Sequence, residues 1–506
     1  MVPLASFARY STGMMLRAAL CGLATFGLLA AGCSGESSES VGPTTITTGG
    51  HHSGGGGAGA NGNSGGTGAS GNSGGTGAMG GTVSCDGMLV ETIANATVVP
   101  SPAGGEPAAG SPFLIPETHV SYRRISDVGD PGASGTDYTN GYSRWSPANI
   151  TGQYATAFGS DGQSAVYRLA DRTIVRSLPV GEANELHWDA TGASGTETML
   201  YYRVDAELRR MDVLVGNEEL VHDFTVEYPT AGAVLNGVEG APSRDMRYWA
   251  FQVCDSMDGG GQCLGIQDII VYDLQSDAVL SRLSDTHPGM PTPNFVDISP
   301  SGSRIVVGTC KDSGSTPAPW DGPYAWSLDF STNVRLDTNC SHSGWAWGSA
   351  GQEYSVAYDT CGANNEEATP TCDFLIAVDV NDPQGWDNRL GIAYWGDIGW
   401  DYSNHMGRIY DSNVRGWFFM STYGELTTGW PAHQLLFVEL VPQASGPRLL
   451  RVGPTVVGYS DYWTEAFASL DFQAEHVYWG SNWDGAANLE LYQATLCSGW
   501  WNAIQP

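Results

Sequence analysis

The sequence predicts an all-β fold, a β-propeller of seven blades that follows a signal peptide and a linker rich in glycine, serine and threonine. Three observations lead to this prediction. A strand–turn–strand pattern recurs seven times, a second apolar strand follows the copies, and no stretch of the repeated region shows a helical period. The 506 residues exceed one ordinary compact core, and a ring of repeated sheets accommodates them.

Residues 1–32 are interpreted as a lipoprotein signal peptide. The stretch "MMLRAALCGLATFGLLAAGC" (14–33) has a short basic start, an apolar run too short for a comfortable membrane span, and small residues at its end. Cys33 follows Ala-Ala-Gly directly, which resembles the lipobox of bacterial lipoproteins, with Leu29 one place early. The resemblance implies lipidation of Cys33; an ordinary secretory signal is the alternative.

The next segment, residues 33–83, is expected to be a disordered, low-complexity tether between the lipidated cysteine and the folded domain. Glycine, serine and threonine dominate it, and "GNSGGTGA" occurs twice, at 62–69 and 71–78. Such a composition offers too little apolar surface to order a chain. We therefore expect a protein anchored to the bacterial outer membrane through its lipid, on the periplasmic face or the cell surface, with its domain in residues 84–506.

The repeat is clearest in "VDISPSGSRIVVGT", which reads as two β-rich strands around a turn at Pro300-Ser301-Gly302. The other copies share an aromatic or apolar inner strand, a small turn and a β-rich strand. They lie at 143–160, 186–204, 241–253, 345–360, 407–423 and 464–482. Apolar strands follow at 268–274, 324–330, 374–380, 434–440 and 489–496. Four short strands per unit are typical of a propeller; a β-sandwich array or two smaller domains are the alternatives.

Ring closure is predicted from the chain ends. After the strand at 489–496 only ten residues remain, so the last blade lacks its outer strand. The spare β-rich segment at 119–127 could supply that strand and remove a free sheet edge.

Eight of the ten cysteines lie beyond Cys33, and an even number in an exported chain predicts disulfides. In the list that follows, the first two bonds would each enclose a short polar loop, the third would join the two ends of the domain, and the fourth pairs the two cysteines that remain. The expected bonds are Cys254–Cys263, Cys361–Cys372, Cys85–Cys497 and Cys310–Cys340.

The turn Ser299-Pro300-Ser301-Gly302 is similar to the Ser-Pro-Asp-Gly turn of TolB-like propeller repeats. The copies that contain "YSRWSP" and "YWTEAFAS" look like the seven-bladed, oligogalacturonate-lyase-like branch of that superfamily. This resemblance covers most of residues 113–496. It implies a metal-dependent polysaccharide lyase, in which a base removes a proton beside a uronate carboxylate and a cation stabilises the enolate.

Four histidines lie just before or at the start of inner strands, which converge at one face of a propeller channel: His187, His287, His342 and His405. Converging imidazoles could hold a divalent metal, the one cofactor the sequence suggests. Arg144 and Arg408 are candidates for binding a substrate carboxylate. The alternative is a set of hydrogen-bonded or solvent-facing histidines without a shared ligand.

The formal net charge of −32 and the lack of a basic stripe argue against nucleic-acid binding. Gly-x-Ser-x-Gly occurs only in the linker, outside the strand–turn–helix context that a nucleophile requires. The leading hypothesis is therefore a lipid-anchored propeller that binds a carbohydrate or protein ligand on its channel face without catalysis. The metal-dependent lyase is the alternative.

Overall fold

The computed structural model describes residues 84–504, except residues 134, 136, 238, 259–260, 311–317, 339–340, 360–372, 400–401, 425–427, 441–445, 460–461 and 487. The signal peptide, Cys33 and the linker up to residue 83 lie outside the described residues, as do Cys340, Cys361 and Cys372. In the part that is described, no helix has the length and apolar character needed to cross a membrane.

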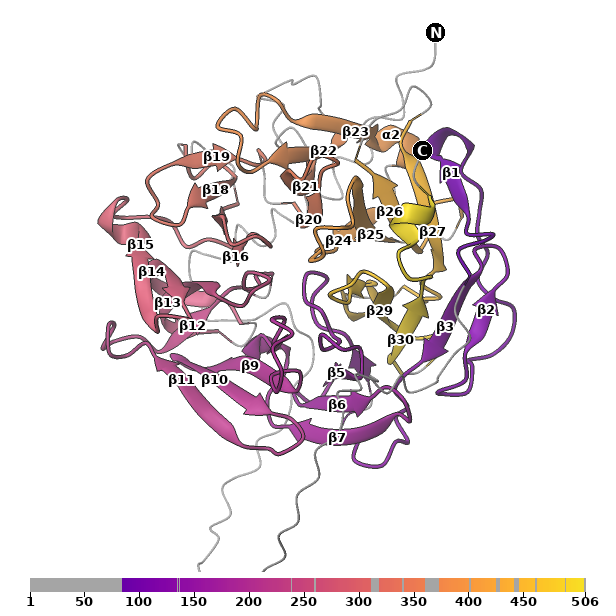
Figure 1. Cartoon of the computed structure of the whole chain (residues 1–506), viewed down its shortest axis with the longest axis horizontal. Coiled ribbons are helices and arrows are strands. Elements are labelled where there is room, and N and C mark those ends of the chain that lie inside the picture. Colours follow the sequence, from indigo (N-terminus) through magenta and orange to yellow (C-terminus); the bar gives the residue numbers. More distant parts are fainter. Residues whose placement is uncertain are drawn as a thin grey trace, which may run out of the picture. The chain divides into compact units, whose positions relative to one another are not determined.

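Antiparallel meanders of short strands are arranged around a ring, each running from a strand near the centre to one at the rim (Figure 1). The first meander contains β4 (Tyr138–Thr139), β5 (Tyr154–Gly159), β6 (Ser164–Arg168) and β7 (Thr173–Leu178), and the second contains β8 (His187–Trp188), β9 (Met199–Val204), β10 (Glu207–Asp212) and β11 (Glu218–Asp223). The third contains β12 (Ala233–Leu235), β13 (Tyr248–Met257), β14 (Cys263–Asp273) and β15 (Ala278–Arg282), and the fourth contains β16 (Phe295–Ile298), β17 (Arg304–Gly308), β18 (Pro323–Ser327) and β19 (Asn333–Arg335). This is an all-β propeller, as predicted.

The remaining meanders bring together both ends of the domain. The fifth meander contains β20 (Ser343–Trp347), β21 (Glu353–Asp359), β22 (Phe374–Asp379) and β23 (Leu390–Tyr394). The sixth contains β24 (Ser403–Met406), β25 (Trp417–Tyr423), β26 (Gln434–Glu439) and β27 (Arg448–Pro454), and β1 (Val90–Thr92) extends it. The seventh contains β28 (Ser469–Leu470), β29 (His476–Ser481) and β30 (Glu490–Thr495), and β3 (Val120–Arg124) and β2 (Phe113–Ile115) extend it. The helical turns are η1 (Ile93–Asn95), η2 (Glu182–Asn184), η3 (Leu283–Asp285), α2 (Trp395–Ile398), η4 (Tyr462–Thr464) and α3 (Trp500–Ala503).

The described strands form six sheets, and the largest, with nine strands, contains two meanders. A single residue pair, Trp347 opposite Trp417, links β20 to β25 and so joins them. Counting these meanders as separate blades gives the number expected from the repeats. The blade count of seven itself stays a prediction.

The hairpin predicted at 296–309 is formed by β16 and β17, with Val296 opposite Val307 and Ile298 opposite Ile305. Gly302 lies in the turn with φ of +75°, a backbone conformation that favours glycine. A Cβ atom at this position would lie 2.8 Å from the ring of Tyr248. The small-residue turn is therefore required both by the backbone and by the packing beneath it.

The core lies between neighbouring meanders, because strands such as β5, β9, β25 and β26 are buried on both faces, whereas outer strands such as β11 are partly exposed. Every residue of β25 and β26 is buried, which explains why these segments read as continuous apolar runs. Trp145, Trp188 and Trp249 come from three successive repeats and share one hydrophobic cluster. These tryptophans therefore have a packing role.

The segment at 119–127 closes the ring, as expected from the sequence. Strand β3 pairs antiparallel with β30, with Ser121 opposite Thr495 and Arg124 opposite Tyr492. Two further N-terminal strands were not anticipated: β2 adds to β3, and β1 adds to the outer strand β27 of the preceding meander. The N-terminal segment thus pairs with two sheets.

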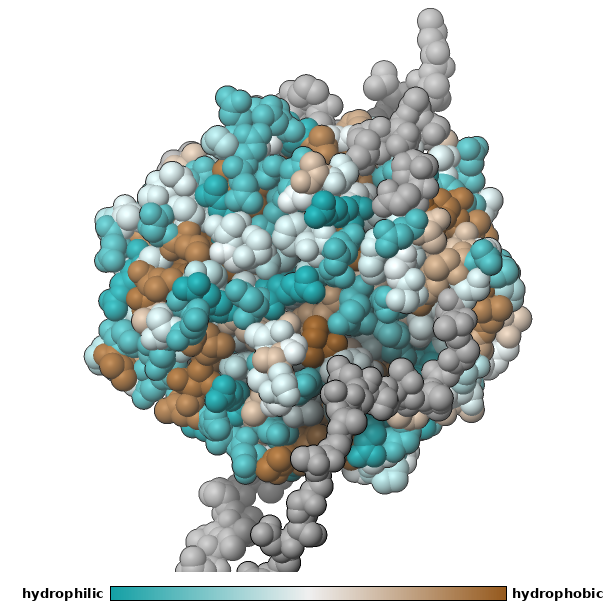
Figure 2. All heavy atoms as spheres, in the orientation of Figure 1, coloured by the Kyte–Doolittle hydropathy of each residue, from teal (hydrophilic) through white to brown (hydrophobic). Residues whose placement is uncertain are grey.

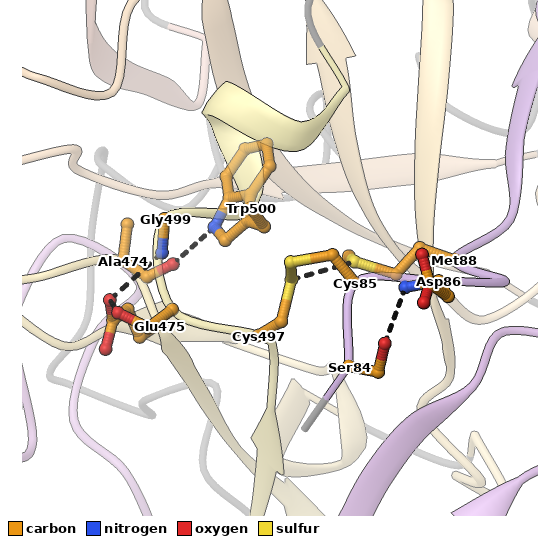
Figure 3. The surroundings of a disulfide bond; sticks show 10 residues. Ser84, Cys85, Asp86, Met88, Ala474, Glu475, Cys497, Gly499 and Trp500 are labelled. Carbon is orange, nitrogen blue, oxygen red and sulfur yellow. Dashed lines mark hydrogen bonds between the residues drawn. A yellow bond between two sulfur atoms is a disulfide. The ribbon is translucent and has the colours of Figure 1, made fainter. Parts of the chain in front are cut away.

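The predicted bond Cys85–Cys497 is present and joins residues 412 positions apart, next to the last helix (Figure 3). Trp500, in α3, donates a hydrogen bond from Nε1 to the carbonyl of Ala474 at 2.8 Å. The disulfide therefore fastens the start of the described chain to its end, beside the meander that closes the ring.

The predicted bond Cys254–Cys263 is also present and brackets the hairpin between β13 and β14. Cys310 is disulfide-bonded as well, and its expected partner, Cys340, lies outside the described residues. The pairing Cys361–Cys372 stays a prediction, since both cysteines lie in a segment that is not described.

Candidate functional site

Two of the four candidate histidines, His342 and His405, lie side by side. Their ring centroids are 4.3 Å apart and the rings are inclined by 25°. His342 directly precedes the inner strand β20, and His405 lies within the inner strand β24. The convergence expected at the inner strands therefore occurs for one pair.

His405 is fully buried and forms a hydrogen bond with Glu465, with 2.9 Å between Nε2 and Oε2. Burial, and next the neighbouring His342, lower the pKa of His405 well below its usual value, so the imidazole is neutral. A neutral ring that donates from Nε2 to a carboxylate carries a lone pair on Nδ1. This Nδ1 is buried and has no hydrogen-bond partner.

The tautomer of His342 is fixed by the backbone. Its Nδ1 lies 2.6 Å from the carbonyl oxygen of Asn404, which can only accept, so Nδ1 carries the proton. The Nε2 atom of a neutral His342 is then a lone-pair acceptor, and the side chain is partly exposed.

Aromatic rings surround His405. Tyr423 stacks on it with centroids 4.7 Å apart and planes inclined by 17°, and Phe467 lies at 4.2 Å. Tyr142 approaches edge-on at 5.7 Å, and Tyr462 packs on Phe467 at 4.9 Å. We call this set the His405 cluster: Tyr142, His342, His405, Tyr423, Tyr462, Glu465 and Phe467.

The cluster reaches the surface through the helical turn η4. Tyr462 and Trp463 are 53% and 55% exposed, which is unusual for such large side chains in this protein. Their rings meet edge-to-face at 5.4 Å. The arrangement combines a buried, polar interior with an exposed aromatic edge, a combination that suits ligand binding.

His187 lies apart from this pair, between Trp145 at 5.3 Å and Trp249 at 5.6 Å. Its buried Nε2 has no hydrogen-bond partner, and it lines a cavity of about 10 Å³. This volume corresponds to about one water molecule. Burial, followed by the charges of Arg408 and Arg203, lowers the pKa of His187 to about 3.

His287 does not join any of the other three histidines. It follows η3, where its ring lies 4.8 Å from that of Trp326 and its Nδ1 lies 2.9 Å from Oγ1 of Thr286. It therefore packs in the connection between two successive meanders.

The guanidinium group of Arg408 is bound by other residues of the protein. Its side chain is fully buried and paired with the equally buried Asp297, at 2.8 Å between Nη1 and Oδ1. Its Nη2 donates to the carbonyl oxygens of Pro242 and Ile298 at 2.9 and 2.6 Å.

Arg144 is likewise bound within the protein. Its Nη2 lies 2.8 Å from Oε2 of Glu239 and donates to Oγ of Ser343, also at 2.8 Å. Because Asp297 lies 3.8 Å from Arg144 as well, the two arginines share one network across several repeats. A substrate carboxylate would have to displace these buried internal partners to reach either guanidinium group.

The residues that the structure describes do not match a metal site. Nowhere in the described ranges do three or more histidine, cysteine, aspartate or glutamate side chains form a group that could hold a metal ion. His342 and His405 supply two stacked rings, and one nitrogen of His405 is engaged by Glu465. A divalent metal therefore stays a prediction of the sequence.

Sequence reasoning missed the acidic partners, Glu465, Glu239 and Asp297, and the phenol of Tyr423. Glu465 lies in the quoted repeat "YWTEAFAS", where a carboxylate two residues before an apolar inner position was a usable signal. The other partners carry no local pattern, because their role arises only from contacts between repeats.

The fold and this site define the class of protein: an all-β propeller with a histidine- and tyrosine-rich cluster at its inner strands. No family model matches the sequence, and no curated protein matches it. Among solved structures, oligogalacturonate lyase from Vibrio parahaemolyticus is similar at 10% identity, with a TM-score of 0.49, over 76% of this chain and 96% of that one. An oligogalacturonate lyase in complex with manganese is similar at 14% identity, with a TM-score of 0.47, over 77% and 97%. Likenesses of this degree say nothing about substrate, so the function has to be argued from the residues.

Proposed function

We propose that the protein is an exported, lipid-anchored propeller that binds a ligand at the His405 cluster without catalysing its conversion. One observation carries the proposal: the exposed rings of Tyr462 and Trp463 adjoin a buried cluster that contains an unpartnered acceptor, Nδ1 of His405. Exposed aromatic rings stack on sugars and other flat ligands, and a few buried polar atoms orient what they bind.

The pairing of the arginines favours this function over a lyase. A uronate-cleaving enzyme needs a cationic group for the substrate carboxylate, and Arg144 and Arg408 already neutralise Glu239 and Asp297. Breaking either pair would leave a buried charge without compensation, which is costly.

Isothermal titration of the mature protein with a panel of oligosaccharides tests the proposal. We expect a ligand whose binding is lost in a Tyr462→Ala, Trp463→Ala double variant. Tyr394→Ala is the matched control, because Tyr394 is a 40% exposed aromatic residue at the end of β23 and should leave affinity unchanged. Equal affinity of the double variant and the wild type would place binding elsewhere.

A metal-dependent oligogalacturonate-type lyase is the second candidate. It is favoured by the partly exposed His342, whose Nε2 is free of the proton and could act as a base. The test is the absorbance of a 4,5-unsaturated uronate product after incubation with oligogalacturonate, with and without manganese. If the product appears with wild type and not with His342→Ala, the protein is a lyase and the proposal of binding without catalysis is wrong.

The lipid anchor is part of the proposal and rests on Cys33 in its sequence context. Radiolabelled palmitate should enter the wild-type protein and be absent from Cys33→Ser. Protease treatment of intact cells then separates the cell surface from the periplasmic face of the outer membrane, since only a surface-exposed domain is cleaved.

A further inference from the structure

We propose that the His405 cluster recognises an organic ammonium group, carried by an amino sugar or by a polyamine. This deepens the proposed function and rests on it, because it assigns a ligand class to the same site. The argument has three parts: the balance of charge, the aromatic rings and the unpartnered nitrogen of His405.

The charges around the site do not balance. Arg144 and Arg408 face the carboxylates of Glu239 and Asp297. His405 adds no positive charge, because burial lowers its pKa well below the usual value. Glu465 and Glu182 add two further carboxyl groups, and the charges of Glu182, Glu465 and Glu239 all act on the phenol of Tyr462. Burial raises the pKa of Glu182 to about 7, so its carboxyl is partly protonated near neutral pH. The other three carboxylates still outnumber the two guanidinium groups and leave the site negative. Figure 2, which is coloured by hydropathy, shows hydrophilic residues over much of one face of the molecule.

The aromatic rings suit a cation as well as a sugar. Tyr142, Tyr423, Tyr462 and Phe467 all belong to the cluster, and Trp463 adjoins it at the surface. The faces of such rings attract ammonium groups through their quadrupole, most strongly where water is excluded. A uronate would meet the same rings together with repulsion from the glutamates.

The unpartnered nitrogen supplies an independent observation that points to a hydrogen-bond donor. His405 is buried within the cluster, with its Nε2 on Glu465 and its Nδ1 without a partner. An ammonium group carries only donors, so it complements both this acceptor and the carboxylates. A carboxylate ligand carries only acceptors and would leave Nδ1 unpaired.

Isothermal titration of the mature protein at low and moderate salt tests the inference with four probes: spermidine, a glucosamine oligomer, the N-acetylated form of that oligomer, and oligogalacturonate. Acetylation removes the charge and keeps the sugar ring. We expect one or both amines to bind, and the N-acetylated oligomer to bind at least about tenfold more weakly. Binding of the glucosamine oligomer alone identifies an amino-sugar site, and binding of spermidine alone identifies a polyamine site.

Two variants locate the binding. Glu465→Gln removes one carboxylate, and Tyr462→Leu removes a ring while keeping an apolar side chain; each should weaken amine binding by about tenfold. Glu219→Gln, on the exposed strand β11, is the matched control and should bind as wild type does. Circular dichroism confirms that each variant is folded.

The outcomes separate this inference from the proposed function. Binding of the N-acetylated oligomer or oligogalacturonate as tight as that of the amines, lost in the Tyr462→Ala, Trp463→Ala variant, overturns the ammonium inference and leaves the binding function standing. Absence of binding by either amine also overturns the inference. If the double variant binds every ligand of the panel as wild type does, the proposed site fails as well.

Discussion

Arg408 and Asp297 show how a side chain's role depends on its partner. Both are fully buried, and the carboxylate of Asp297 also accepts hydrogen bonds from Nε1 of Trp345 at 2.6 Å and from the backbone of Ala241 at 2.8 Å. Arg408 was a candidate for substrate recognition by its type, and in the fold its guanidinium group ties several repeats together. Buried pairs of this kind are costly to break rather than strongly stabilising to form.

Replacing Asp297 by Asn should lower the free energy of unfolding by about 3–5 kcal/mol, because Arg408 would keep a buried charge without its partner. Urea unfolding measures the change. Asp171→Asn is the control: Asp171 pairs with Arg168 at the surface, with exposures of 50% and 43%, so its loss should cost under about 1 kcal/mol. Similar losses in the two variants would contradict a special role for the buried pair.

The buried carboxyl of Glu182 should make the stability of the protein depend on pH. Burial raises the pKa of its carboxyl from 4.5 to about 7. The folded state therefore holds its proton more tightly than the unfolded state, so this contribution to stability is complete below about pH 4.5 and is lost as pH rises through about 7. Glu182→Gln removes the titration. The melting temperature of wild type relative to this variant should fall between about pH 5 and about pH 8; a constant difference would contradict the assignment.

Among the elements of the fold, the N-terminal strands β1 and β3 pair with strands that lie far from them in the sequence. Strand β3 has only five residues, yet it lies between β2 and β30 and completes the last meander. Ser121 and Tyr122 lie opposite residues of both neighbouring strands, so their backbone groups point to one strand or the other and not to solvent. Its stability comes from a strand more than three hundred residues away in the chain.

Ser121→Pro should therefore destabilise the closure, because proline removes a backbone donor from a strand paired on both sides. We expect a loss of about 1–3 kcal/mol and faster proteolysis near the N-terminus of the domain. Ser121→Ala keeps the donor and is the control, so it should resist proteolysis as wild type does. Equal cleavage of both variants would show that β3 does not secure the ring.

In the molecule as a whole, the Cys85–Cys497 bond and the N-terminal strands both tie together the two ends of the domain, where the ring closes. The bond spans 412 residues, whereas Cys254–Cys263 spans 9, so the two constrain the unfolded chain to very different degrees. The longer loop restricts the unfolded ensemble more and also protects the site where the ring closes.

Replacing Cys85 and Cys497 by Ser should lower the free energy of unfolding by about 2–5 kcal/mol, and replacing Cys254 and Cys263 should cost less. Chemical unfolding under non-reducing conditions compares the two double variants with wild type. A larger loss for the short loop would show that local strain of the hairpin, and not chain entropy, dominates.

The sequence by itself determined the all-β propeller, its closing strand and the two disulfides seen in full. These features follow from local information: the recurring apolar, β-rich strands, the small residues of turns such as the one at Gly302, and the positions of cysteines at loop and chain ends. Only the tertiary structure decided which side chains meet. His405 and Glu465 are 60 residues apart and Arg408 and Asp297 are 111 apart, so each pair lies in different repeats. Their contacts depend on how the sheets close around the centre, and a pattern of period two along one strand carries no information about that distance.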